Sequence, residues 1–367
     1  MKLLQVLCST MLASVMCCLP AFAQMPGTAN QSDRQITASE RLLLIDNLIR
    51  EVDNRYVFPD RAKKVAASLR EQEKRGAYDK ITSAQQLSSV LTQKLQAEAG
   101  DRHLRVMYSE KLIPERKPNT EPSPDDVARY LAITQSDNFG VEKIEHLPFN
   151  IGYRELASFV PVKDAAETLA AAMTVLAHTD ALIIDLRDNG GGDAAASALM
   201  ASYFLDERSR LNDLYYREDN RVEQRWSLEV VPGLRYGRKK DVYILTSKDT
   251  FSAAEDFTYA LKNLKRATVV GETTGGGANS GDDIRLLPNF AAFIPLSRLI
   301  SPYTKSNWEG IGITPDMKVC AADAMRIAQA AILKKWIFSE KAPAKLEHMN
   351  RRITELGTEN VASTDCH

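Results

Sequence analysis

Residues 181–193, ALIIDLRDNGGGD, have the pattern of a buried strand that runs into a glycine-rich turn. The first six residues are almost wholly apolar, as in strands covered on both faces. A helix is predicted to follow from about Ala194. The order recurs with a strand at 242–246, a helix at 252–264 and a strand at 267–270. This alternation predicts an α/β core with a largely buried sheet.

Residues 37–100 have a helical pattern instead. Apolar residues recur at intervals of three and four in the stretches 42–52, 65–69 and 87–95. Ser83 followed by Gln86 resembles the capping box that starts a helix. We therefore predict a small all-α lobe that precedes the α/β core.

Both ends of the chain are predicted to lie outside the folded core of residues 101–336. Residues 1–23 combine Lys2, an apolar run and the sequence Ala-Phe-Ala, the pattern of a cleaved export signal. An uncleaved membrane anchor is the alternative. Residues 24–36 are predicted to be a flexible linker, and the charged segment 337–367 a loosely attached tail. The mature protein is then expected to be periplasmic or secreted.

Composition narrows the function further. The chain has 367 residues, 44% of them hydrophobic, and a net charge of −1, so no basic surface indicates nucleic-acid binding. Once the signal is removed, Cys320 and Cys366 are the only cysteines. In an oxidising compartment they could pair, or both could stay free thiols. Without a neighbouring histidine pattern they do not make a zinc site.

Ser252 is the candidate nucleophile. It follows the strand 242–246 and opens the predicted helix 252–264. A strand-turn-helix corner holds a hydroxyl rigidly beside free backbone N–H groups and the positive end of a helix. That setting suits an attacking oxygen and its developing oxyanion. A serine here is also a common helix N-cap, so the position alone does not decide between the two roles.

His103 is the candidate base, because a serine hydroxyl needs a base within hydrogen-bond reach at neutral pH. It ends a Gly-Asp-x-His turn at 100–103 that leads into a predicted strand at 104–108. The other four histidines lie in the charged tail, at a helix end or in an irregular segment. The alternative is a turn histidine satisfied by local hydrogen bonds.

Two further features complete the candidate site. Glycines at 190–192 allow the backbone to approach a ligand with its N–H groups exposed, which suits a phosphate or an oxyanion. The Walker and dinucleotide motifs are absent here and at 275–277, so nucleotide binding is not expected, and a structural turn is the alternative. Glu309 could orient a histidine, or could be an exposed glutamate before a turn.

Taken in order, these segments resemble the S41 serine peptidases, which include C-terminal processing peptidases, the tricorn core and the interphotoreceptor retinoid-binding protein modules. The matching blocks are GDRH at 100–103, IIDLRDNGGG at 183–192, SKDTFSAAEDF at 247–257 and NWEGIGITPD at 307–316. The N-terminal helices resemble the retinoid-binding-protein-like branch. The resemblance covers roughly residues 40–335 and implies a crotonase-like ββα-spiral core.

By position, the resemblance implies Ser252 as nucleophile, His103 as general base and Glu309 as the acid that orients it. It also implies an oxyanion hole made by the N–H of Ala253 and a glycine of the 190–192 run. Gly191 is preferred to Gly190, because relatives can carry proline at the latter position and proline has no N–H.

Three departures from the family pattern matter. Gly277 stands where Ser-Lys processing peptidases have their lysine, which leaves the Ser-His mechanism. About 45 residues separate His103 from Ile151, too few for the PDZ domain of those peptidases. Arg102 replaces the usual glycine of the D-G-H motif and could alter the entry of the next strand.

The expected function is that of an exported serine endopeptidase that acts on peptide or protein substrates without a metal or cofactor. The alternative is a carrier that binds an apolar ligand in the same cleft. Retention of the serine, the histidine and the glutamate favours the peptidase, since a pure carrier has no need of them.

Overall fold

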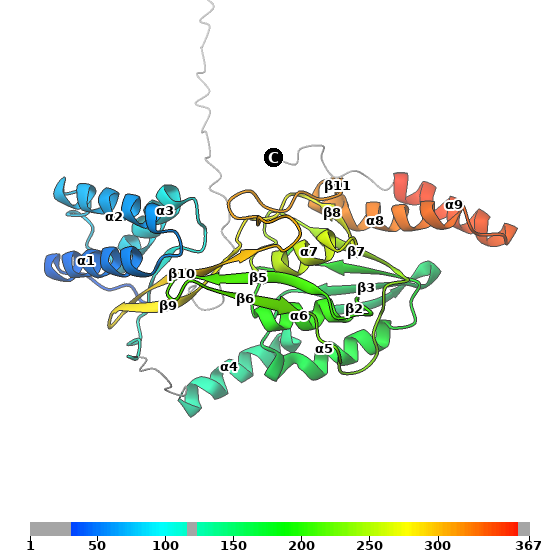
Figure 1. Ribbon diagram of the computed structural model, residues 1–367, viewed down its shortest axis with the longest axis horizontal. Coiled ribbons are helices and arrows are strands. Elements are labelled where there is room, and N and C mark those ends of the chain that lie inside the picture. The colour runs from blue at the N-terminus through cyan, green and yellow to red at the C-terminus, as the bar shows by residue number, and fades with distance from the viewer. Residues whose placement is uncertain (1–30, 116–122, 359–367) are drawn as a thin grey trace, which may run out of the picture. The chain divides into compact units, whose positions relative to one another are not determined.

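The computed structural model describes residues 31–115 and 123–358 (Figure 1). The predicted export signal (1–23) and Cys366 lie outside the described residues. Within the described part, no helix combines the length and the apolar character needed to cross a membrane.

A six-stranded sheet forms the centre of the α/β part. Neighbouring strands are parallel except for the antiparallel pair at one edge, β2 and β3. In spatial order the strands are β11 (Met317–Lys318), β8 (Thr268–Gly271), β7 (Asp241–Thr246), β4 (Ala181–Asp185), β3 (Ile151–Leu156) and β2 (Val141–Leu147). The sequence predicted β4, β7 and β8 to within one residue at each end.

Helices cover both faces of this sheet, which explains the apolar run of β4. Leu182 and Ile184 face a core shared with α5 (Val162–Leu176), α6 (Ala194–Ser202) and α7 (Ala253–Asn263). Ile183 faces a second core shared with α8 (Ala321–Trp336) and α9 (Pro343–Thr358). All five residues of β4 are buried, because successive side chains point to opposite and equally covered faces.

A second, antiparallel sheet was not predicted. Its strands are β1 (Arg105–Tyr108), β10 (Phe290–Ile300), β5 (Arg210–Tyr216) and β6 (Arg221–Trp226), with β9 (Asn279–Leu287) also paired to β10. The β9–β10 ladder has a register shift between Pro295 and Ser297. Proline lacks a ladder N–H and is tolerated at such an irregularity.

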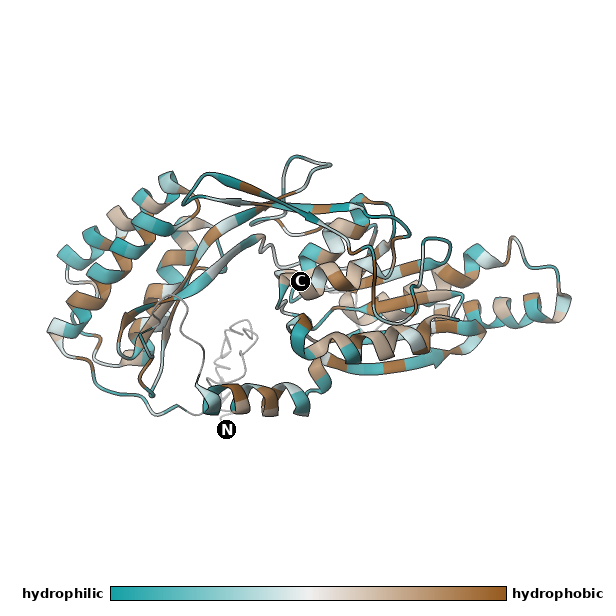
Figure 2. Cartoon of the chain, turned by 60° about the horizontal axis from the view of Figure 1, so that its bottom comes forward, coloured by the Kyte–Doolittle hydropathy of each residue, from teal (hydrophilic) through white to brown (hydrophobic). Residues whose placement is uncertain are grey.

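The N-terminal helices are α1 (Ala38–Arg55), α2 (Pro59–Lys74) and α3 (Ala84–Ala99), as the sequence predicted. Thr37 and Glu40 form the capping box of α1, and Ser83 accepts the N–H of Gln86 at 2.9 Å to start α3. Bands of hydrophobic and hydrophilic residues alternate along the helices (Figure 2). Their apolar residues share one core with Val106, Phe290 and other residues of β1, β9 and β10. The helices are thus packed against the antiparallel sheet.

Two predictions about the chain ends are wrong. The part of the predicted tail that forms α9 is not loosely attached, because Met349 and Leu356 are buried against α8. Residues 34–36 do not belong to a flexible linker, because the N–H of Ile36 donates to the carbonyl of Thr82 at 2.7 Å. In addition, α4 (Pro124–Ser136), η1 (Asn138–Gly140) and η2 (Pro148–Asn150) were not predicted.

The packing of α9 predicts a stability effect. Met349→Ala should lower the free energy of unfolding by about 2–5 kcal/mol, because it leaves a cavity against α8. The exposed neighbour Glu347, changed to alanine, is the matched control and should alter it by no more than about 0.5 kcal/mol. Urea unfolding of both variants is the measurement, and equal stabilities would contradict the packing of α9.

Candidate active site

Ser252 occupies a strained turn between β7 and α7. Its φ of 54° and ψ of −117° lie in a region that residues with a β-carbon rarely adopt. Such conformations cost about 1–3 kcal/mol and persist only where the surroundings enforce them. Here the turn is held at both sides: the N–H of Phe251 donates to the carbonyl of Asn189 at 3.0 Å, and the hydroxyl of Thr250 donates to the carbonyl of Leu186 at 2.7 Å.

Glu255, in the first turn of α7, fixes this corner from within. It is fully buried, and its carboxylate accepts four hydrogen bonds. The donors are the N–H of Ser252 (2.9 Å), the hydroxyl of Thr274 (2.5 Å) and the N–H groups of Gly276 and Gly277 (2.8 Å each). Burial raises the pKa of Glu255 to about 7 against the opposing effect of these donors. Glu255 ties the serine to the 274–277 loop. No role was predicted for this residue from the sequence.

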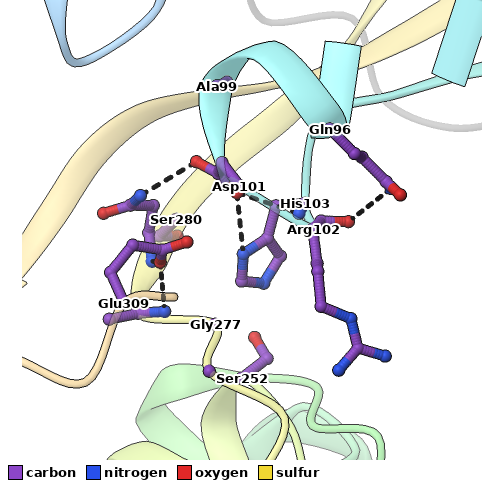
Figure 3. Close-up of polar contacts among 12 residues, drawn as sticks. Gln96, Ala99, Asp101, Arg102, His103, Ser252, Gly277, Ser280 and Glu309 are labelled. Carbon is purple, nitrogen blue, oxygen red and sulfur yellow. Dashed lines mark hydrogen bonds and ion pairs between the residues drawn. The ribbon is translucent and has the colours of Figure 1, made fainter. Parts of the chain in front are cut away.

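His103 lies beside this corner with its ring between Asp101 and Ser252 (Figure 3). The side chain is 6% exposed and packs on the ring of Phe251, with a centroid separation of 4.5 Å. Nδ1 lies 3.7 Å from Oδ1 of Asp101, and the backbone N–H of His103 donates to the same oxygen at 2.9 Å. The alternative of a turn histidine satisfied by local ring hydrogen bonds finds no support here. Both ring nitrogens are buried without a hydrogen-bond partner among the described residues.

Asp101, which is buried, and Glu309, which is half-buried, form an acidic pair next to this ring. Asp101 also accepts the hydroxyl of Tyr56 at 3.0 Å and the side-chain amide of Asn279 at 2.9 Å. Glu309 Oε2 accepts the N–H groups of Ala278 and Asn279 at 2.6 and 3.1 Å, while Oε1 is buried without a partner among the described residues. Glu309 is therefore half-buried, with its carboxyl group directed into the site.

The pKa values of the two carboxyl groups are shifted in opposite directions. Burial, followed by the negative charge of Asp101, raises the pKa of Glu309 to about 8. Burial acts in the same direction on Asp101, but the hydrogen bonds and charge of His103 outweigh it and lower the pKa of Asp101. The carboxylate that lies next to Nδ1 of the histidine ring, at 3.7 Å, is that of Asp101, which was not predicted as the orienting acid. Glu309 keeps that assignment only as a hypothesis.

The ligand atoms of Asp101, His103 and Glu309 lie within 4.8 Å of one another, so these are also the residues that could hold a metal ion. Asp101 already accepts three hydrogen bonds and Glu309 two. Because N–H and O–H groups already donate to both carboxyl groups, these residues suit a hydrogen-bonded catalytic group.

The glycine turn lies directly against Ser252. Gly191 has a φ of 109°, and a β-carbon there would lie 2.7 Å from Cβ of Ser252, so only glycine fits. Its N–H, however, donates to Oδ1 of Asn189 at 2.8 Å. This contact counts against the prediction that Gly191 supplies an oxyanion-hole N–H. Gly192 and Ala253, by contrast, line the cavity next to Ser252.

The structure explains the two unusual residues near the base. A β-carbon on Gly277 would lie 2.5 Å from Cε1 of His103 and 2.3 Å from the ring of Phe251, so a lysine cannot occupy this position without rearrangement. Arg102 donates to the carbonyl of Gly275 at 3.0 Å and stacks over Phe251 at 5.0 Å. It therefore bridges two loops of the site.

Two family models match the chain. The model described as "Peptidase family S41" matches residues 150–319, and "N-terminal domain of Peptidase_S41 in eukaryotic IRBP" matches residues 38–138. The chain belongs to peptidase family S41, as its motifs predicted.

Named relatives cover only parts of the chain. It is 28% identical over 172 residues to "Carboxyl-terminal-processing peptidase 2, chloroplastic" of Arabidopsis thaliana, which is 45% of this chain and 31% of that protein. It is 33% identical over 103 residues to "Probable CtpA-like serine protease" of Staphylococcus aureus, strain COL, which is 27% of this chain and 20% of that protein. The chain thus spans less than a third of the length of these relatives.

Solved structures share the fold. A candidate peptidase from Parabacteroides merdae superposes with a TM-score of 0.55 at 23% identity over 80% of this chain and 95% of that one. A lipoprotein from Streptococcus agalactiae superposes with a TM-score of 0.50 at 14% identity over 79% and 95%. The α/β fold of this family with an N-terminal helical region is thereby confirmed.

The strain at Ser252 predicts an unusual order of stabilities. The free energy of unfolding of Ser252→Gly should be about 1 kcal/mol higher than that of Ser252→Ala. Glycine relieves about 1–3 kcal/mol of backbone strain at this position and costs about 0.5–1 kcal/mol in chain entropy. At the exposed Ser339, which has no positive φ, the glycine variant should be the less stable of the pair. Urea unfolding measures both pairs, and the same order at the two sites would refute the strain.

The raised pKa of Glu309 predicts a pH effect on stability. The folded state binds the proton of Glu309 more tightly than the unfolded chain does. The contribution of this proton to the stability of the folded protein is therefore fully present below the ordinary pKa of 4.5 and is lost as the pH rises toward about 8. The stability of Glu309→Gln relative to the native protein should therefore grow by more than about 1 kcal/mol between pH 5 and pH 8.5. The exposed Glu167, changed to glutamine, should show no such growth. A constant difference for Glu309→Gln would contradict the shift.

Proposed function

We propose that this chain is an exported serine peptidase that cleaves peptide bonds through an acyl-enzyme on Ser252. The observation that carries the proposal is the strained Ser252 beside a buried histidine whose ring nitrogens have no other partner among the described residues. Membership of peptidase family S41 supports the reaction class.

His103 is the general base. Nδ1 faces Asp101, so Nε2 is the nitrogen left to take the proton of the serine hydroxyl. The Asp101 carboxylate holds the ring orientation and stabilises the imidazolium that forms. It can do so because Tyr56, Asn279 and the His103 backbone keep it fixed by hydrogen bonds.

The tetrahedral oxyanion is held at the start of α7. Ala253 is the first residue of this helix, where backbone N–H groups have no partner within the helix. A second N–H comes from the glycine turn, from Gly192 or Gly190, or from Gly191 if it exchanges its bond to Asn189. His103 then returns its proton to the leaving amine, and water hydrolyses the acyl-enzyme.

Two features support this reading over the apolar carrier. The cavity beside Ser252 has a volume of about 50 Å³, and a single water needs about 10–15 Å³. A charged pair, Arg225 and Asp256, lines part of it. An extended apolar ligand requires a larger and less polar space.

Export rests on two observations. Residues 1–23 have the pattern of a signal peptide, and Cys320, which caps α8, is disulfide-bonded. Disulfides persist in oxidising compartments such as the periplasm or the exterior of the cell. Its pairing with Cys366 stays a prediction, because Cys366 lies outside the described residues.

Hydrolysis of a protein substrate such as casein tests the activity. Ser252→Ala and His103→Ala should each lower turnover by on the order of 10³-fold or more, with unfolding temperatures near that of the native protein. The exposed serine variant Ser339→Ala is the control and should remain active. Hydrolysis that survives in Ser252→Ala would overturn the proposal.

The two acids can be separated by isosteric amides. Asp101→Asn should reduce kcat/KM by on the order of 10²–10⁴-fold, since the histidine loses its orienting charge. Glu309→Gln should be less impaired, because glutamine imitates the protonated acid that a pKa of about 8 implies at neutral pH. A larger loss in Glu309→Gln would return the orienting role to Glu309.

A further inference from the structure

A small cavity opens beside Ser252 at the start of α7. The residues that line it come from the glycine turn, the start of α6, the 277–278 loop, strands β5, β6, β9 and β10, and Ser252 with the first turn of α7. A space of about 50 Å³, where one water needs about 10–15 Å³, holds only a few non-hydrogen atoms.

An ion pair between the half-buried Arg225 and the buried Asp256 lines this cavity. Nη1 of Arg225 lies 3.0 Å from Oδ2 of Asp256, and the two side chains are 11% and 5% exposed. Asp256 also accepts the hydroxyl of Ser197 at 3.0 Å and the amide of Asn212 at 2.7 Å. Arg225 donates a second hydrogen bond to the carbonyl of Ala194. Both charges are thus fully engaged inside the protein.

The pair is tied to the nucleophile by the helix itself. Asp256 lies one turn after Ser252 on α7, and its N–H donates to the Ser252 carbonyl at 2.9 Å. Both side chains line the cavity. Arg225 reaches it from β6 of the antiparallel sheet and fills the space next to the carboxylate. The remaining walls include the apolar side chains of Leu214 and Leu299.

We propose that this cavity receives the substrate side chain on the acyl side of the scissile bond, and that the Arg225–Asp256 pair restricts it to small uncharged residues. The inference rests on the proposed peptidase function. A long side chain does not fit beside Arg225. A lysine finds the Asp256 carboxylate already occupied, and an acidic side chain would be buried against that carboxylate.

Removal of Arg225 should reverse this selectivity. Arg225→Ala vacates the space of a long side chain and leaves Asp256 without its counter-ion. A lysine side chain of the substrate can then occupy the place of the guanidinium and pair with the carboxylate. Asp256→Asn added to this variant keeps the space but removes the charge, so only uncharged long side chains should benefit.

The experiment uses a series of peptidyl diphenyl phosphonates that differ only in the side chain next to phosphorus: alanine, valine, norleucine, phenylalanine, lysine and glutamate. The rate of covalent modification of the full chain is followed by intact mass. For the native protein, alanine and valine should react at least about tenfold faster than the other four. Arg225→Ala should raise the norleucine and lysine rates relative to alanine by about tenfold or more. Arg225→Ala/Asp256→Asn should keep the norleucine gain and lose the lysine gain.

Each outcome bears on one claim. No modification by any member of the series overturns the peptidase proposal, and this inference falls with it. Modification of Ser252 at similar rates across the series overturns the selectivity alone. Arg225→Ala leaves a buried charge unpaired, so thermal unfolding accompanies the rates. If that variant does not fold, the rates of the native protein with the six phosphonates test the selectivity on their own. A preference for phenylalanine, lysine or glutamate then refutes the inference.

Discussion

The strained backbone at Ser252 is the constraint on which the site depends. A side chain at a φ of 54° is held there only because neighbouring loops fix the turn from several directions. The strand-end loops after β4 and β7 bond to each other, and Glu255 ties the start of α7 to the 274–277 loop. The glycines at 191 and 277 follow from this geometry, since a β-carbon at either position would collide with the serine corner or the histidine ring.

Buried carboxyl groups provide the electrostatics of the site, and each has a distinct environment. Glu255 accepts hydrogen bonds from backbone N–H groups and so fixes the backbone at Ser252 and in the 274–277 loop. Asp101 is held by donors and faces the imidazole, which favours its charged form. Glu309 is half-buried beside Asp101, and its desolvation and the charge of Asp101 favour its neutral form. Two neighbouring acids with opposite pKa shifts can therefore serve different roles, as in other enzymes that pair carboxyl groups.

The sequence allowed a largely buried sheet to be predicted, because β4, β7 and β8 are apolar runs that end in polar or glycine-rich turns. The antiparallel sheet escaped prediction, since β9 carries Asp282 and Asp283 and β10 contains Pro295, which hide the strand pattern. Helix α9 was missed because its buried residues, such as Met349 and Leu356, are sparse among charged ones. Ser252 and His103 were visible from their chemistry and motifs. The positions of Asp101 and Glu255 depend on contacts with distant residues, such as Asn279 with Asp101, 178 positions apart.

The most direct measurement of the central claim is the trapping of the covalent intermediate. The full chain is mixed with an activated ester of a short peptide, quenched in acid within the first turnover, and analysed by intact mass and peptide mapping. The account predicts a burst of leaving group that matches the enzyme concentration, with the acyl group on Ser252. A linear release without a burst and without an adduct, or an acyl group on another residue, would contradict it.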